Sequence, residues 1–127
     1  MRVLIAEDNR TVADTLADMI DASEHEVVGM VGSGIEAIHA YERHKPDVVL
    51  MDCLMSRLNG VTACRNIMAK DSGARVVLVS GSMGPEDLAS THCGAFAILQ
   101  KPIRLRDLKE LLAGVPEREV ATGQASG

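Results

Sequence analysis

Polar side chains that could do chemistry follow apolar segments at four places in this chain. They are a pair of acids, a third acid, a hydroxyl and a lysine, namely Glu7 and Asp8, Asp52, Ser80, and Lys101. Carboxylates bind hard divalent cations, while a hydroxyl and an ammonium stabilise charge on transferred oxygens. If the four positions meet in space, this set of residue types could support metal-assisted phosphoryl transfer.

The three acids need a counter-charge if they lie together. Two unit charges about 4 Å apart repel by about 4 kcal/mol at an effective dielectric constant near 20. Mg²⁺ (or Mn²⁺) relieves this repulsion, and Mg²⁺ suits a site with few protein carboxylates that keeps several waters. In such a site Asp52 could act as a nucleophile on phosphorus, with Lys101 and Ser80 stabilising the transferred oxygens.

The segments that must position these residues are short, apolar and rich in β-branched side chains. They predict strands at 3–6, 26–31, 48–51, 76–79 and 95–99, with helical spacing between them. Continuous apolar strands alternating with helices indicate an α/β fold, a parallel sheet covered on both faces. In the flavodoxin-like doubly wound (βα)5 sandwich, with strand order 2-1-3-4-5, the first and third strands are neighbours. Glu7, Asp8 and Asp52 then share one sheet edge.

Local signals place the helix ends. Asn9 and Ser33 are suited to N-cap positions, and Pro46 marks the end of the second helix. Pro85 is suited to the first position of a fourth helix that Gly94 keeps short.

We predict one folded domain over residues 1–114 and a disordered tail over 115–127, because the tail is poor in apolar residues.

Composition excludes several classes of protein. The chain has 127 residues, a net charge of −5 and 2% aromatic residues, which argues against direct nucleic-acid binding. Its three cysteines, Cys53, Cys64 and Cys93, form no Cys-x-x-Cys pair and suggest a reduced compartment. The first apolar segment is too short for a signal peptide or a membrane span. We therefore expect a cytoplasmic protein without membrane contact.

The ordered set of residues resembles the receiver domain of bacterial two-component response regulators, most of all the stand-alone, chemotaxis-regulator-like receivers. The resemblance runs from Arg2 to about Ala113. In that family an acidic pair follows the first strand and the phosphoacceptor ends the third. A Ser or Thr ends the fourth strand and Lys-Pro ends the fifth. The matching residues here are Glu7, Asp8, Asp52, Ser80, Lys101 and Pro102, with Gly60 and Gly94-Ala95 as further matches.

The resemblance implies a function and a set of partners. Asp52 would accept a phosphoryl group from a sensor histidine kinase or a histidine phosphotransfer protein, with Mg²⁺ held by Glu7, Asp8, Asp52 and the backbone carbonyl of Leu54. The chain would be a signalling domain rather than an enzyme, with self-phosphotransfer and slow autodephosphorylation. It would act on a downstream protein target as a monomer or weak homodimer. The Lys101-Pro102 bond is a candidate cis peptide.

Three positions depart from the family pattern. Ser56 replaces a proline that stiffens the loop after the phosphoacceptor, and Gly81 replaces the usual alanine. Ile98 stands where receivers carry an aromatic residue that changes rotamer on activation. Because Ile98 is β-branched and stiff about χ1, we predict that residues 81–84 and the short helix after them carry the switch instead. Ser80 and Lys101-Pro102 complete the predicted switch.

Two other functions are compatible with parts of the sequence. Because Ile98 replaces the aromatic switch residue, the chain could instead be a receiver-fold interaction module whose regulation does not depend on phosphate. Gly32 to Ala37 formally matches a dinucleotide-binding fingerprint, with Asp52 about twenty residues further on. That match gives no role to Glu7, Asp8, Ser80 or Lys101 and leaves no room for a substrate domain. A flavin-binding flavodoxin is a weaker match still, because its first loop must hold phosphate.

Overall fold

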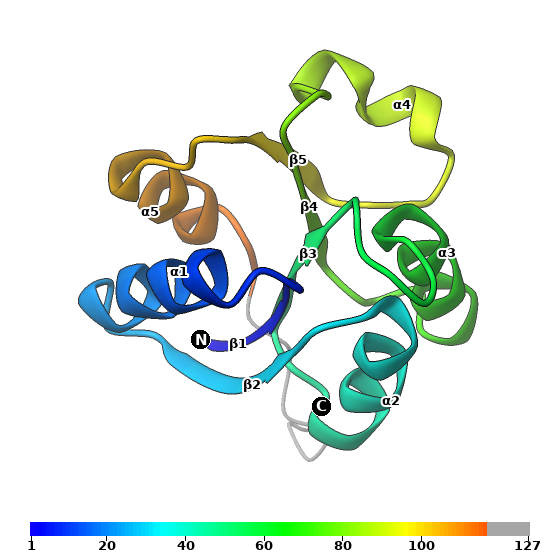
Figure 1. The fold of residues 1–127 in the computed structure, drawn as a ribbon, viewed down its shortest axis with the longest axis horizontal. Coiled ribbons are helices and arrows are strands. Elements are labelled where there is room, and N and C mark those ends of the chain that lie inside the picture. The colour runs from blue at the N-terminus through cyan, green and yellow to red at the C-terminus, as the bar shows by residue number, and fades with distance from the viewer. Residues whose placement is uncertain (117–127) are drawn as a thin grey trace.

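The β-branched segments form the strands of a single parallel sheet in the computed structural model, which describes residues 1–116 (Figure 1). The strands are β1 (Arg2–Ala6), β2 (Glu26–Val31), β3 (Val48–Asp52), β4 (Val76–Ser80) and β5 (Ala97–Gln100). They lie in the order β2-β1-β3-β4-β5. The predicted fold class and strand order are confirmed, so the ends of β1 and β3 are neighbours at the switch point of the sheet.

The helices cover the sheet on both faces (Figure 1). They are α1 (Arg10–Ala22), α2 (Gly34–His44), α3 (Gly60–Lys70), α4 (Leu88–Thr91) and α5 (Leu105–Ala113), with a 3₁₀ turn at Pro85–Asp87 before α4. Side chains of Asn9, Ser33 and Asn59 accept hydrogen bonds from the first turns of α1, α2 and α3. Within residues 1–116 we find no helix with the length and apolarity that crossing a membrane requires.

The alternation of side chains along each strand divides the core into two clusters. On β1, Val3 and Ile5 face α1 and α5, and Leu4 and Ala6 face α2 and α3. Between their polar end residues, β1, β3 and β4 are apolar and buried, as expected for strands whose two faces are both covered. The polar residues at those ends are therefore held by the core of the domain.

Some element boundaries differ from the prediction. β5 begins at Ala97, two residues later than predicted, and Phe96 is 37% exposed. α4 is short, as predicted, and the left-handed residue His92 follows it. Val115 lies in the predicted tail, but in the structure it is buried against the α1 and α5 side of the core, so the predicted boundary at 114 is too early. The predicted tail from residue 117 onward lies outside the described residues.

Candidate functional site

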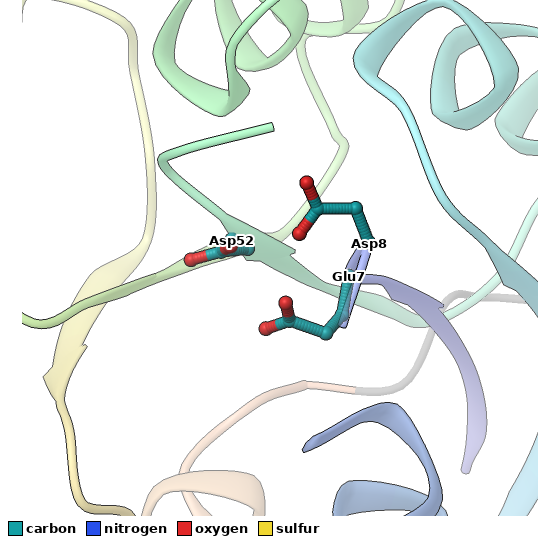
Figure 2. A group of neighbouring side chains, drawn as sticks. All are labelled: Glu7, Asp8 and Asp52. Carbon is teal, nitrogen blue, oxygen red and sulfur yellow. The ribbon is translucent and has the colours of Figure 1, made fainter. Parts of the chain in front are cut away.

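Three carboxylates meet where β1 and β3 end. Glu7 and Asp8 follow β1 and project toward Asp52, the last residue of β3 (Figure 2). One carboxylate oxygen from each residue lies within 4.8 Å of the others. Glu7 and Asp52 are buried, whereas Asp8 is exposed. The structure thus brings together the three acids that the sequence placed at one sheet edge.

Lys101 supplies positive charge to this cluster from the end of β5. Its Nζ lies 3.3 Å from Glu7 Oε1 and 3.3 Å from Asp52 Oδ1. Its backbone N–H donates to Ser80 O at 2.7 Å, which ties the ends of β4 and β5 together. The Lys101-Pro102 peptide is cis, as predicted.

The pKa values of Glu7 and Lys101 follow from burial and from the neighbouring charges. Burial raises the pKa of Glu7, and the charge of Asp52 adds to this, although the Asn9 N–H and Lys101 oppose it. For Lys101, burial acts to lower the pKa, but the charges of Asp52 and Glu7 outweigh it and the pKa is raised. Lys101 therefore stays charged, but its single positive charge does not balance the formal charges of the three acids.

The donor set fits a hard divalent cation. The three acids and Lys101 together have a formal net charge of −2. All the side-chain donors are oxygens, and exposed Asp8 leaves one side of the cluster open to water. Mg²⁺ prefers this combination of few carboxylates, retained waters and shared phosphoryl oxygens.

Ser80 lies at the same sheet edge, but its hydroxyl is engaged with the loop that follows β4. Ser80 Oγ accepts hydrogen bonds from Ser82 N at 3.1 Å and Met83 N at 2.9 Å. This is an ST-type turn, in which a side-chain oxygen holds the backbone just ahead of it. Sequence reasoning missed this contact, although a serine before a glycine-rich loop is the signal that would have found it.

The other predicted switch and loop residues fall around this edge. Ile98 is buried in the core cluster on the α2 and α3 side. A Cβ added to Gly81 would meet nothing within 4 Å, so the position is spacious. Leu54, two residues after Asp52, is 77% exposed. Burial raises the pKa of Cys53 to about 11, so the thiol beside Asp52 is protonated at neutral pH.

The dinucleotide interpretation fails because the amides at the start of α2 already have partners within the chain. Gly34 N donates to Leu58 O, and Ile35 N donates to Arg57 O. Gly32 N donates to the Glu36 carboxylate at 3.0 Å. A pyrophosphate needs these amides free at the helix N-terminus.

Comparisons with known proteins agree with the geometry. The model of the response regulator receiver domain family matches residues 3–113. The transcriptional regulatory protein PdtaR of Mycobacterium tuberculosis is 40% identical over 107 residues, covering 84% of this chain and 52% of that protein. The chain thus spans about half the length of this curated relative. The chemotaxis protein CheY of Thermotoga maritima is 34% identical over 113 residues, covering 87% of this chain and 93% of that protein.

Solved structures show the same arrangement of elements. The CheX-CheY-BeF3-Mg complex of Borrelia burgdorferi matches with a TM-score of 0.84 and 27% identity, covering 91% of this chain and 88% of that chain. The receiver domain of the sensor histidine kinase PA1611 of Pseudomonas aeruginosa, with magnesium in its active-site cleft, matches with a TM-score of 0.80 and 26% identity. Those matched residues cover 90% of this chain and 95% of that chain. By sequence and by fold, this chain belongs to the response regulator receiver domain family.

Proposed function

We propose that Asp52 accepts a phosphoryl group from the phosphohistidine of a sensor histidine kinase or a histidine phosphotransfer protein. The observation that carries this proposal is the position of Asp52 Oδ1, 3.3 Å from Lys101 Nζ and beside the carboxylates of Glu7 and Asp8. A buried carboxylate with an adjacent fixed cation and an open acidic cluster is suited to receive a phosphoryl group.

The chemical step is an in-line displacement. A carboxylate oxygen of Asp52 attacks phosphorus, the P–N bond to the donor imidazole breaks, and the imidazole leaves with the bonding electrons. The product is an aspartyl phosphate. Lys101 is already within ion-pair distance of Asp52 and would neutralise a phosphoryl oxygen without moving far.

The proposed cation is Mg²⁺ (or Mn²⁺), held by Glu7, Asp8, Asp52 and the backbone carbonyl of Leu54. When bound, this cation would neutralise and orient the phosphoryl oxygens. The uncompensated charge of the acidic cluster supports the assignment. The magnesium described for the PA1611 receiver domain lends further support.

The proposed readout uses the loop after β4. If the Ser80 hydroxyl moved toward the phosphoryl group to donate a hydrogen bond there, it would leave Ser82 N and Met83 N, from which it now accepts hydrogen bonds. Those amides would lose their acceptor, so the loop from Gly81 to Gly84 would rearrange. Ile98 is packed in the core and would stay in place, while Lys101 and Pro102 anchor the end of β5.

The wider biological setting of the proposal follows the family. The folded domain would act in the cytoplasm as a signalling domain, not as an enzyme that turns over substrates. It would transmit its state to a downstream protein, either as a monomer or as a weak homodimer. Slow self-dephosphorylation would reset it.

A two-dimensional NMR comparison tests the proposed function. We expect Mg²⁺ with beryllofluoride, a phosphoryl analogue, to shift the amides around Asp52, Ser80 and Lys101, and Asp52→Asn to abolish the response. If the wild type gives no response, the interaction module that works without phosphate becomes the better description. The second function is kept open by Ile98, which is buried and is not the aromatic residue that the resemblance leads one to expect at this position.

A further inference from the structure

The loop that follows the phosphoacceptor is fastened to the N-terminus of α2. Leu58 O accepts a hydrogen bond from Gly34 N at 3.1 Å, and Arg57 O accepts one from Ile35 N at 3.3 Å. The first amides of a helix have no partner inside the helix. Two carbonyls of the β3–α3 loop therefore cap α2, and α2 in turn holds the tip of that loop.

This contact requires unusual residues on both sides. A Cβ added to Gly34 would clash with Leu58 O, so the close approach depends on glycine. On the loop side, φ is 52° at Arg57 and 87° at Leu58. A positive φ at a non-glycine residue persists only when the surrounding structure enforces it. The hydrogen bonds to α2 supply that enforcement.

The base of the same loop is fastened beside the phosphoacceptor. Gly60 N donates to Cys53 O at 2.9 Å, and Cys53 N donates to Val79 O at 3.0 Å. A Cβ at Gly60 would clash with Asp52 O. The segment 53–59, which includes Leu54, is therefore held by backbone hydrogen bonds at both its base and its tip.

We propose that the N-terminus of α2 is a brace for the phosphoacceptor loop, with Gly34 and Leu58 as positioning residues. The brace would stiffen a loop that has no proline of its own over residues 53–59, where Ser56 lies near the middle. It fixes the direction of the backbone near Leu54 relative to Asp52. This inference rests on the proposed function for its purpose, but the brace itself can be tested without phosphorylation.

The first test compares Gly34→Ala with Gly32→Ala. The added Cβ at Gly34 collides with Leu58 O, whereas at Gly32 the nearest atoms are 3.9 Å away, so Gly32→Ala is a matched control. We expect Gly34→Ala to speed hydrogen exchange of the Cys53 and Gly60 amides about 10-fold. We also expect it to raise the Mg²⁺ dissociation constant about 10-fold, the usual effect of removing support from a metal ligand. The control should change neither.

A second pair of variants breaks the brace from the loop side and covers the case in which Gly34→Ala does not fold. Leu58→Val puts a β-branched residue at a positive φ that it disfavours, while Leu58→Asn puts there a residue that tolerates positive φ. We expect Leu58→Val to loosen the loop and weaken Mg²⁺ binding, and Leu58→Asn to do so much less.

Rescue separates positioning from general damage. Ser56→Pro, added to whichever of Gly34→Ala and Leu58→Val folds, should restore Mg²⁺ affinity at least in part, because proline stiffens the same loop. The proposed role of the brace is contradicted if the loop amides of both Gly34→Ala and Leu58→Val exchange hydrogen at the same rates as in their control variants. If the exchange changes as expected but the wild type binds no Mg²⁺, the brace stands and the proposed function fails.

Discussion

Lys101 Nζ lies 3.3 Å from Asp52 Oδ1, although the two residues are far apart in the chain. The same ammonium is 3.3 Å from Glu7 Oε1, so it bridges a buried pair of carboxylates. β4 brings the two residues together, because it pairs with β3 on one side and with β5 on the other. This relationship joins the charge balance of the resting protein to the proposed phosphoryl transfer.

Replacement of Lys101 should slow the phosphorylation of Asp52. Lys101→Met removes the cation beside Asp52, so we expect the rate of phosphorylation by a small phosphodonor to fall about 100-fold, as for loss of one charge-stabilising donor. Lys101→Arg keeps the charge with a different geometry and should lose less. Stopped-flow kinetics with Mg²⁺ present measures both variants. Equal rates for wild type and Lys101→Met would contradict the assigned role.

Replacement of the two acids of the β1 turn should affect Mg²⁺ unequally. We expect Asp8→Asn to raise the Mg²⁺ dissociation constant more than 10-fold, and Glu7→Gln to raise it less, because Glu7 is already paired with Lys101. Without Mg²⁺, Asp8→Asn should raise the urea midpoint, since it removes one charge from a repelling cluster. NMR titration and urea unfolding check the two effects. An unchanged Mg²⁺ affinity in Asp8→Asn would remove Asp8 from the metal site.

We expect the loop that begins at Gly81, and not Ile98, to change conformation when the site is occupied. A phosphoryl analogue should shift the amides of residues 81–88 strongly and the methyl groups of Ile98 weakly. Gly81→Ala fits the resting loop, because its Cβ meets nothing within 4 Å, but it restricts the backbone that must move. We therefore expect Gly81→Ala to diminish the response at 81–88 while leaving the fold intact.

Ser80→Ala is the companion variant for the switch. It removes the acceptor of Ser82 N and Met83 N and should lower the free energy of unfolding by about 1 kcal/mol. It should also shrink the analogue response. A rotamer change at Ile98 with a silent loop, or a full response in Gly81→Ala, would show that the switch lies elsewhere.

The buried thiol of Cys64 predicts how stability depends on pH. Burial raises its pKa in the folded state above the value of about 8.5 for an unfolded chain. Below that value both states keep the proton and stability is full. Above it the unfolded state ionises first, so the free energy of unfolding falls with a limiting slope of about 1.4 kcal/mol per pH unit. Urea unfolding between pH 8 and 10 should show a shallower decline for Cys64→Ala, and parallel curves would refute the assignment.

The sequence predicted the sheet and the site edge because both depend on local signals that agree with one another. Val48 to Met51 is continuously apolar, so it had to be a central strand, and Asp52 had to stand at its end. Asn9 and Ser33 cap helices as their residue types predict. Parallel pairing then brings Lys101 to Asp52 without further information.

Other features depend on contacts between distant segments and could not be predicted from local patterns. The left-handed conformation of Leu58 is set by the amides of α2, which lie far away in sequence. Val115 looked like part of a polar tail, but it packs against the core below α1 and α5. Phe96 looked like a strand residue, but β5 begins after it.

Phosphorylation of Asp52 is the central claim, and intact-mass spectrometry tests it most directly. The protein is incubated with a small phosphodonor such as acetyl phosphate, with and without Mg²⁺, beside Asp52→Asn. We predict one phosphoryl adduct that requires Mg²⁺, is lost in base and hydroxylamine, and is absent from Asp52→Asn. An adduct that persists in Asp52→Asn, or a wild type that gains none, would contradict the proposed function.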